Sequence, residues 1–319
     1  MDKHLSVSPV RDCGLVWIPD QTMNAYVDHN FLINCLNRSG WRAIAISARE
    51  RHDVKFVLSP WSIYEIGDAT RPHMEELLAV AEELDPSWIL ERVDLQLREF
   101  VVAWNNFWNG TRTPFNPILP TLQEVQASFL RCSLAEVQRY SVRDYAGMWH
   151  REDAAREVDV EFQRQESISS LNRVMFGDGK LTSAAQLEIR KRYVARQFVI
   201  CRRVGMPLHE IYQRQNWILR EESLKTFIWF FVEFGGMDEM LAHGVEESLT
   251  FNQWKTEARL NPNRQLDRFH AITALPYCDL FVTSDRELVK KTQAVRSDLK
   301  FKIAEVISGE EFIVRLEKG

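Results

Sequence analysis

The sequence predicts an α/β fold with a central parallel sheet in a three-layer α/β/α arrangement, interrupted by a large, mainly α-helical insertion. Three short apolar runs indicate buried parallel strands, because each ends abruptly in a polar residue and is followed by a helical pattern. These runs are residues 25–27, 55–58 and 280–283. A fourth strand is expected at residues 301–306, and a change of pattern over residues 71–257 indicates the insertion.

Helix-start signals follow each of the first three strands. Asp28-His29-Asn30 leads from the first strand into the apolar segment FLINCL. Ser59-Pro60 follows the second strand, where serine suits an N-cap and proline suits the first helical position. After the third strand, Ser284 and Glu287 have the spacing of a capping box. Each strand is therefore expected to pass directly into a helix.

Between residues 71 and 257 strand-like alternation disappears, and apolar residues recur every three or four positions. One such run covers residues 74–84 and stops before Asp85-Pro86, and the next begins at Ile89 and continues to Trp104. We therefore expect a discontinuous α/β domain, made of residues 1–70 and 258–319, with residues 71–257 as a helical insertion.

Composition indicates a folded protein and excludes several classes. The 319 residues are 45% hydrophobic and 27% charged, and 40 Lys and Arg against 45 Asp and Glu give a net charge of −5. The chain is therefore not a polycation that binds nucleic acid by bulk charge. Five scattered cysteines without CxxC spacing argue against a disulfide framework and a zinc site. No apolar stretch approaches the ~20 residues of a membrane helix. A cytoplasmic protein is expected.

Four acids are candidates for chemistry, because ligands of an open α/β sheet bind beyond the carboxyl ends of its strands. Asp28 and Asp285 follow strands, Glu65 lies about two turns into the helix opened by Ser59-Pro60, and Asp267 opens a helical stretch before the third strand. Singly, Asp28, Asp267 and Asp285 are equally well explained as helix caps, and Glu65 as a solvated helix residue. Their convergence on one edge of the sheet favours a functional site.

At these residues the sequence resembles the PIN-domain nucleases. The matching segments are YVDHNFLI, LSPWSIYEI and DRFHAITALPYCDLFVTSD, which together with their flanks cover about a third of the chain. The resemblance implies a PIN-like fold and an endonuclease that acts more readily on RNA than on DNA. It places Asp28, Glu65, Asp267 and Asp285 at the active site. The long insertion departs from the pattern of the family.

Clustered carboxylates suit Mg²⁺ or Mn²⁺, which prefer hard oxygen ligands. Two carboxylates ~4 Å apart repel by about 4 kcal/mol at an effective dielectric near 20, and a bound cation relieves this repulsion. Asp28 and Asp285 are the expected principal ligands, with Asp267 as a ligand or a base that orients water, and Glu65 as a ligand or an outer group. The expected reaction is metal-assisted hydrolysis of a phosphodiester.

Three polar neighbours, Asn30, Ser59 and Thr283, are expected to orient carboxylates or phosphate, with local capping as the alternative. Asp279 is expected to start the third strand, and His270 to be a packed helix histidine.

A basic segment within the insertion offers a second nucleic-acid contact. Its cationic residues on one helix include Arg190, Lys191, Arg192, Arg196 and Arg203. Such a face suits phosphate contacts, and a solvated helix surface is an equal alternative. Trp104 and Trp108, one turn apart beside three asparagines, are expected to border a polar groove.

Two rival functions remain open from the sequence. One is a non-catalytic PIN-like scaffold that binds nucleic acid or protein. The other is a metal-dependent phosphohydrolase acting on small phosphate esters, although Asp28-His29-Asn30 lacks the DxD expected of such a nucleophile motif. An inhibitory or regulatory protein partner and a homo-oligomer are compatible with all three hypotheses.

Overall fold

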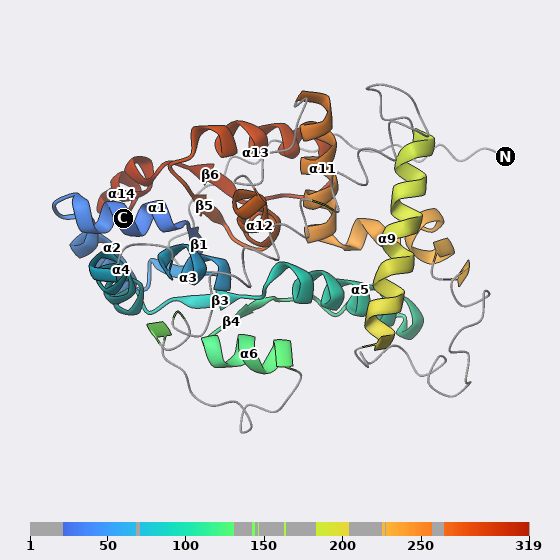
Figure 1. Ribbon diagram of the computed structural model, residues 1–319, viewed down its shortest axis with the longest axis horizontal. Coiled ribbons are helices and arrows are strands. Elements are labelled where there is room, and N and C mark those ends of the chain that lie inside the picture. Colours follow the sequence, from blue (N-terminus) through green and yellow to red (C-terminus); the bar gives the residue numbers. More distant parts are fainter. Residues whose placement is uncertain are drawn as a thin grey trace.

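The computed structural model describes residues 22–67, 71–130, 183–203, 228–256 and 265–318, together with residues 142, 143, 146, 163, 225 and 226. Six strands within these ranges form one sheet (Figure 1). They are β1 Met23–Val27, β2 Val54–Leu58, β3 Ser87–Ile89, β4 Ile118–Leu119, β5 Leu280–Val282 and β6 Glu305–Ile307.

The sheet has the order β4-β3-β2-β1-β5-β6, and only the β3–β4 pair is antiparallel. β1 therefore lies between a strand that follows it closely in the sequence and a strand from the far end of the chain. The expected α/β class with a mainly parallel central sheet is confirmed. Three predicted strands agree with β1, β2 and β5 to within two residues at each end, whereas the fourth begins at Glu305, later than expected.

Two strands lie where none was expected. β3 and β4 fall within residues 71–257, and β3 extends the parallel sheet beyond β2. The expectation of a strand-free segment was wrong at these positions. The proposed division of the chain at residue 70 remains a prediction.

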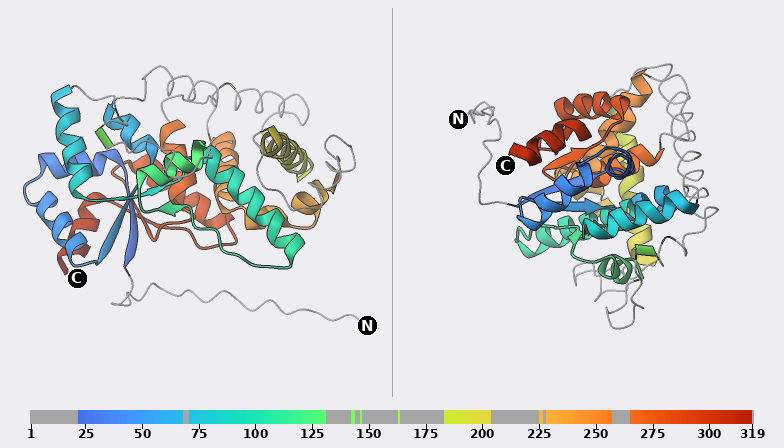
Figure 2. Two further views of the ribbon diagram at one scale, coloured as in Figure 1. Left: turned by 90° about the horizontal axis from the view of Figure 1, so that it is seen from below. Right: turned by 90° about the vertical axis from the view of Figure 1, so that its left-hand side faces the viewer.

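Helices flank the sheet in the views of Figure 2. The α-helices in the described ranges are α1 His29–Asn37, α2 Trp41–Glu50, α3 Pro60–Gly67, α4 Arg71–Glu83, α5 Arg92–Asn109, α6 Leu122–Leu130, α9 Ser183–Arg203, α11 Leu241–Thr256, α12 Gln265–Ala274, α13 Arg286–Asp298 and α14 Gly309–Lys318. A π-helical turn, η2 Trp229–Glu233, and a 3₁₀ turn, η3 Gly236–Glu239, precede α11. None of these described helices has both the length and the apolar composition needed to cross a bilayer.

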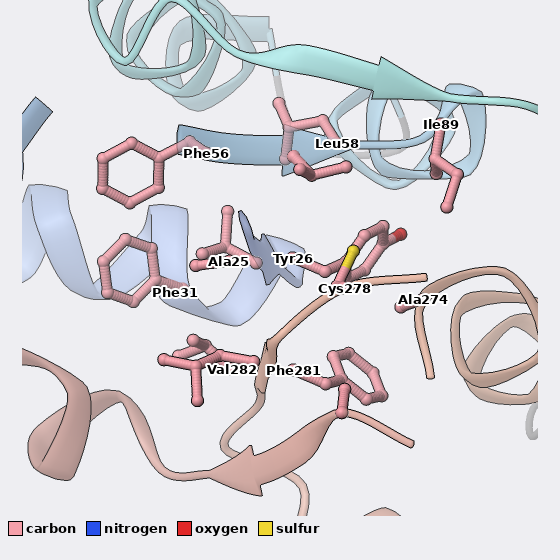
Figure 3. Close-up of a cluster of buried hydrophobic side chains, with 14 of the residues drawn as sticks. Ala25, Tyr26, Phe31, Phe56, Leu58, Ile89, Ala274, Cys278, Phe281 and Val282 are labelled. Atoms are coloured by element: carbon pink, nitrogen blue, oxygen red, sulfur yellow. The ribbon is translucent and has the colours of Figure 1, made fainter. Parts of the chain in front are cut away.

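The central strand is covered on both faces. Ala25, Tyr26 and Val27 are fully buried, and Figure 3 shows Ala25 and Tyr26 on opposite sides of β1. Because successive side chains of a strand point to opposite faces, a strand buried throughout needs a layer on each side. Phe31 and Phe56 pack on one side, next to Ala25 (Figure 3). This burial is compatible with a three-layer arrangement.

The helical run that ends before Asp85 is confirmed as α4, and the following run as α5, although α5 begins at Arg92 and not at Ile89. Trp104 does not border a polar groove. It is fully buried and packs against Phe230 and Phe231 of η2 in a second hydrophobic cluster. The aromatic spacing on α5 therefore serves packing.

A buried carboxylate joins α5 to the start of α11. Glu99 accepts a hydrogen bond from the backbone N–H of Ala242 at 2.8 Å and another from the hydroxyl of Tyr277. Burial raises the pKa of Glu99 to about 7, against the lowering effect of these hydrogen bonds. A carboxylate at a helix N-terminus is well placed to satisfy N–H groups that have no partner within the helix.

Candidate active site

The site begins where β1 and β5 end. β1 is the point at which the strand order reverses, because β2 lies on one side of it and β5 on the other. Val27 and Val282 are register partners, and the N–H of Asp28 donates to the carbonyl of Val282 at 3.2 Å. Asp28 and Thr283 therefore emerge together at the position where open α/β sheets bind ligands.

Asp28 is buried and held from several sides. Its Oδ2 accepts a hydrogen bond from Thr283 Oγ1 at 2.7 Å and a longer one from Asn30 Nδ2 at 3.4 Å. Its Oδ1 caps α1 by accepting from the N–H of Phe31 at 3.0 Å. Burial raises the pKa of Asp28, while Thr283 and Phe31 oppose the increase. Thr283 therefore contacts this carboxylate, as expected of an orienting residue, and Asn30 makes the weaker contact. The functional role of both residues stays a prediction.

Glu65, near the end of α3, lies between two histidines. Its Oε2 is 3.0 Å from Nε2 of His270 and 3.3 Å from Nδ1 of His29. Burial alone would raise the pKa of Glu65, but the charges and hydrogen bonds of His270 and His29 outweigh it and lower the pKa to about 2. Glu65 is therefore ionised, and both imidazoles donate to it.

His270 extends this contact into the core. Its Nδ1 is hydrogen-bonded to the hydroxyl of Tyr26, which in turn lies 2.8 Å from Ser59 Oγ and 3.3 Å from Ser62 Oγ. His270 is packed in α12 as expected, with 2% of its surface exposed, but it also fixes Glu65. The expectation that Ser59 orients an active-site carboxylate or phosphate was wrong, because its buried hydroxyl faces Tyr26.

Asp267 occupies the first turn of α12 and is partly buried. Burial raises its pKa to about 6. His270 opposes the increase, while the negative charges of Asp285, Glu65 and Asp28 add to it. Charges act on one another in this way only over short distances. The four predicted acids therefore lie close enough to influence one another, although they come from opposite ends of the chain.

Asp285 is the N-cap of α13. Its Oδ1 accepts from the N–H groups of Glu287 at 2.7 Å and Leu288 at 3.1 Å, and its own N–H donates to Thr283 Oγ1 at 3.1 Å. The predicted capping box between Ser284 and Glu287 was wrong, because Asp285 provides the cap. Capping and a functional role are compatible here, since no hydrogen bond to Oδ2 is found among the described residues.

The four acids fit a hard divalent cation in chemistry and charge. Their oxygens are the ligands that Mg²⁺ and Mn²⁺ prefer. The pKa of Asp267 is raised first by burial, and the negative charges of the other three acids add to the increase. Within the described ranges, however, no three His, Cys, Asp or Glu side chains are gathered closely enough to hold a metal ion. The carboxylates would have to move closer together to share one.

Asp279 lies at the opposite end of β5, where its Oδ2 accepts from the N–H of Asn24 at 2.9 Å. This confirms the expectation that Asp279 lies at the start of the strand.

The basic segment forms the expected helix, α9, but not all of its cations face solvent. Arg190 makes two hydrogen bonds of 2.7 Å to Glu247 of α11, and its expected contact with phosphate stays a prediction. Arg192 and Arg196 are exposed, and Arg192 also lies 3.3 Å from Glu188. Lys191 is half-buried, and the side chain of Arg203 lies outside the described residues.

Comparison with known proteins identifies no relative: no protein-family model, no curated protein and no solved structure gives a significant match. The site must therefore be interpreted from its own residues.

Sequence reasoning missed two contributors, His29 and Tyr26. His29 was detectable in principle, because it follows Asp28 at a strand end. Tyr26 gave no signal, since a strand tyrosine whose ring is buried resembles any other core aromatic residue.

Proposed function

We propose that this protein is a metal-dependent endonuclease that hydrolyses phosphodiester bonds, with Mg²⁺ or Mn²⁺ as cofactor and RNA as the favoured substrate. The proposal rests mainly on the mutual influence of four acids: Asp28 and Asp285, which follow β1 and β5, and Glu65 of α3 and Asp267 of α12. The resemblance of the surrounding segments to PIN-domain nucleases supports the same reaction, and it is the reason for favouring RNA over DNA.

Asp28 and Asp285 would be the principal ligands of the metal ion, with Asp267 as a further ligand or as the base that orients water. Asp28 is kept in place by Thr283, and Asp285 by the first turn of α13. A bound divalent ion lowers the pKa of water and neutralises charge on the phosphate under attack. Asp267, with a pKa near 6, is suited to accept a proton from water close to neutral pH.

Substrate charge has to be accommodated beside these acids. A nucleic-acid strand brings one phosphate per nucleotide, and the exposed arginines Arg192 and Arg196 on α9 are candidates to contact it away from the reacting phosphate.

The direct test is to incubate the protein with labelled RNA, single-stranded DNA, duplex DNA and a chromogenic phosphomonoester, each with Mg²⁺, Mn²⁺ or a chelator. Asp28→Asn and Asp285→Asn should abolish cleavage with little loss of stability, because asparagine is also a good N-cap. Asp279→Asn is the matched control, since it makes the same change at the opposite end of the β1–β5 pair.

Three results would contradict the proposal in different ways. Cleavage that survives both Asp28→Asn and Asp285→Asn would reject the site. Turnover of the phosphomonoester alone would favour a phosphohydrolase of small esters. Binding of nucleic acid without cleavage under any metal condition would favour a scaffold.

A further inference from the structure

His29 lies beside the acids of the candidate site and is partly exposed. It is the first residue of α1, directly after Asp28, and its Nδ1 lies 3.3 Å from Glu65 Oε2. The side chain keeps 28% of its surface exposed. No hydrogen bond or ion pair to the other ring nitrogen, Nε2, is found among the described residues. One nitrogen of the ring is thus fixed, and the other remains available to a ligand.

The carboxylate that holds His29 is itself fixed from the core. His270 Nε2 donates to the same oxygen of Glu65 at 3.0 Å, and Tyr26 holds His270 through Nδ1. Ser59 lies 2.8 Å from the Tyr26 hydroxyl. A hydrogen-bonded chain of buried groups therefore runs from β1 to Glu65. Such support is typical of side chains that orient a functional group.

The charges around the site favour contact between His29 and an anionic ligand. The strongest favourable charges on Glu65 come from His270 and His29, and those on Asp28 and Asp267 come from His270. His270 is buried, whereas His29 reaches solvent. A phosphate that approaches these acids meets His29 as the accessible donor.

We propose that His29 contacts the substrate, with its Nε2 binding a phosphate oxygen of the nucleic-acid strand, and that Glu65 positions this imidazole and does not serve as a metal ligand. The identity of the substrate rests on the proposed nuclease function. The contact itself rests on the geometry of His29, Glu65 and His270.

Two substitutions of His29 test the roles of its two ring nitrogens separately. The amide nitrogen of asparagine lies near the position of Nδ1, so His29→Asn keeps a partner for Glu65 and removes the donor to the phosphate. The amide nitrogen of glutamine lies near the position of Nε2, so His29→Gln keeps a donor for the phosphate. His73→Asn, on helix α4, is the control for loss of an imidazole elsewhere.

Binding is measured by fluorescence anisotropy with a short labelled single-stranded RNA and its DNA counterpart, with Mg²⁺ present. All variants are made in the Asp285→Asn background, which should not cleave the probe. We expect His29→Asn to weaken binding on the order of 10-fold, as for loss of a charge-assisted hydrogen bond. His29→Gln should lose less affinity, and His73→Asn should lose none.

Equal affinities for all variants, or equal losses in both His29 variants, would overturn the proposed contact. Cleavage by the unsubstituted chain distinguishes this failure from failure of the nuclease proposal. If that chain cleaves but His29→Asn and His29→Gln bind alike, the contact is wrong and the nuclease stands. If the unsubstituted chain does not cleave but the expected order of affinities holds, the proposed His29 contact is supported and the proposed nuclease function is wrong. A chain that neither binds nor cleaves overturns both.

Discussion

Replacing Glu99 with glutamine should change the pH dependence of folding by an amount that follows from its burial. The carboxyl has a pKa of about 7 in the folded protein, against 4.5 for an ordinary glutamate. The folded state therefore holds an extra proton between these values. One pKa unit corresponds to about 1.4 kcal/mol, so ionisation of Glu99 removes up to about 3 kcal/mol of stability.

The sign follows from the raised pKa. The stabilising effect of the protonated carboxyl is fully present below pH 4.5 and is lost as the pH rises toward 7, with no further change above that value. Glutamine resembles the protonated form and keeps an oxygen that accepts from Ala242 and Tyr277. Glu99→Gln should therefore match the unsubstituted chain near pH 4.5 and exceed its stability by up to about 3 kcal/mol at pH 8.

Urea-induced unfolding of both chains between pH 4.5 and 8.5 measures this difference. Contributions from the acids of the candidate site are common to both chains and cancel in the comparison. Glu239→Gln, which removes an exposed acid just before α11, controls for the loss of one negative charge. A stability difference between Glu99→Gln and the unsubstituted chain that is the same at every pH would refute the assignment.

Three further predictions test other parts of the structure. Thr283→Val removes the donor to buried Asp28 and should lower cleavage about tenfold and stability by about 2 kcal/mol, measured by initial rates and urea unfolding; unchanged values would show that the hydrogen bond is unimportant. Replacing Arg192 or Arg196 with alanine should reduce the slope of log affinity against log salt by about 0.7 for each phosphate that the variant no longer neutralises, and an unchanged slope would remove α9 from the RNA interface. Trp104→Ala leaves a cavity between α5 and η2 and should cost about 3–5 kcal/mol in urea unfolding, a loss that a solvent-facing tryptophan would not produce.

The main strands were predictable because burial left a simple pattern. β1, β2 and β5 are short apolar runs with a polar residue after each, and burial on both faces makes such a run continuous. β3 was missed because it has three residues, and because Ile89 happens to lie at helical spacing from Val93 and Leu97. Periodicity cannot separate so short a strand from the helix that follows it.

The acids of the candidate site and the polar neighbours of Asp28 were predictable, but the histidines that hold Glu65 were not. Asp28, Asp267 and Asp285 lie at strand or helix ends, which the sequence marks. The role of Glu65 depends on His29 and His270, which lie on α1 and α12 and meet it only in the folded chain. Glu65 and His270 are 205 residues apart in the sequence, and a hydrogen bond across such a separation leaves no local sequence pattern.

The pairing of β1 with β5 also sets the order in which the site is completed during protein synthesis. Thr283 and Asp28 are 255 residues apart, so the first acid is made long before its partner. A growing or prematurely terminated chain that lacks the last helices has Asp28 and Glu65 but neither Asp267 nor Asp285. If the protein cuts RNA, this arrangement keeps the nascent chain harmless to the messenger that encodes it until Asp267 and Asp285 have been made.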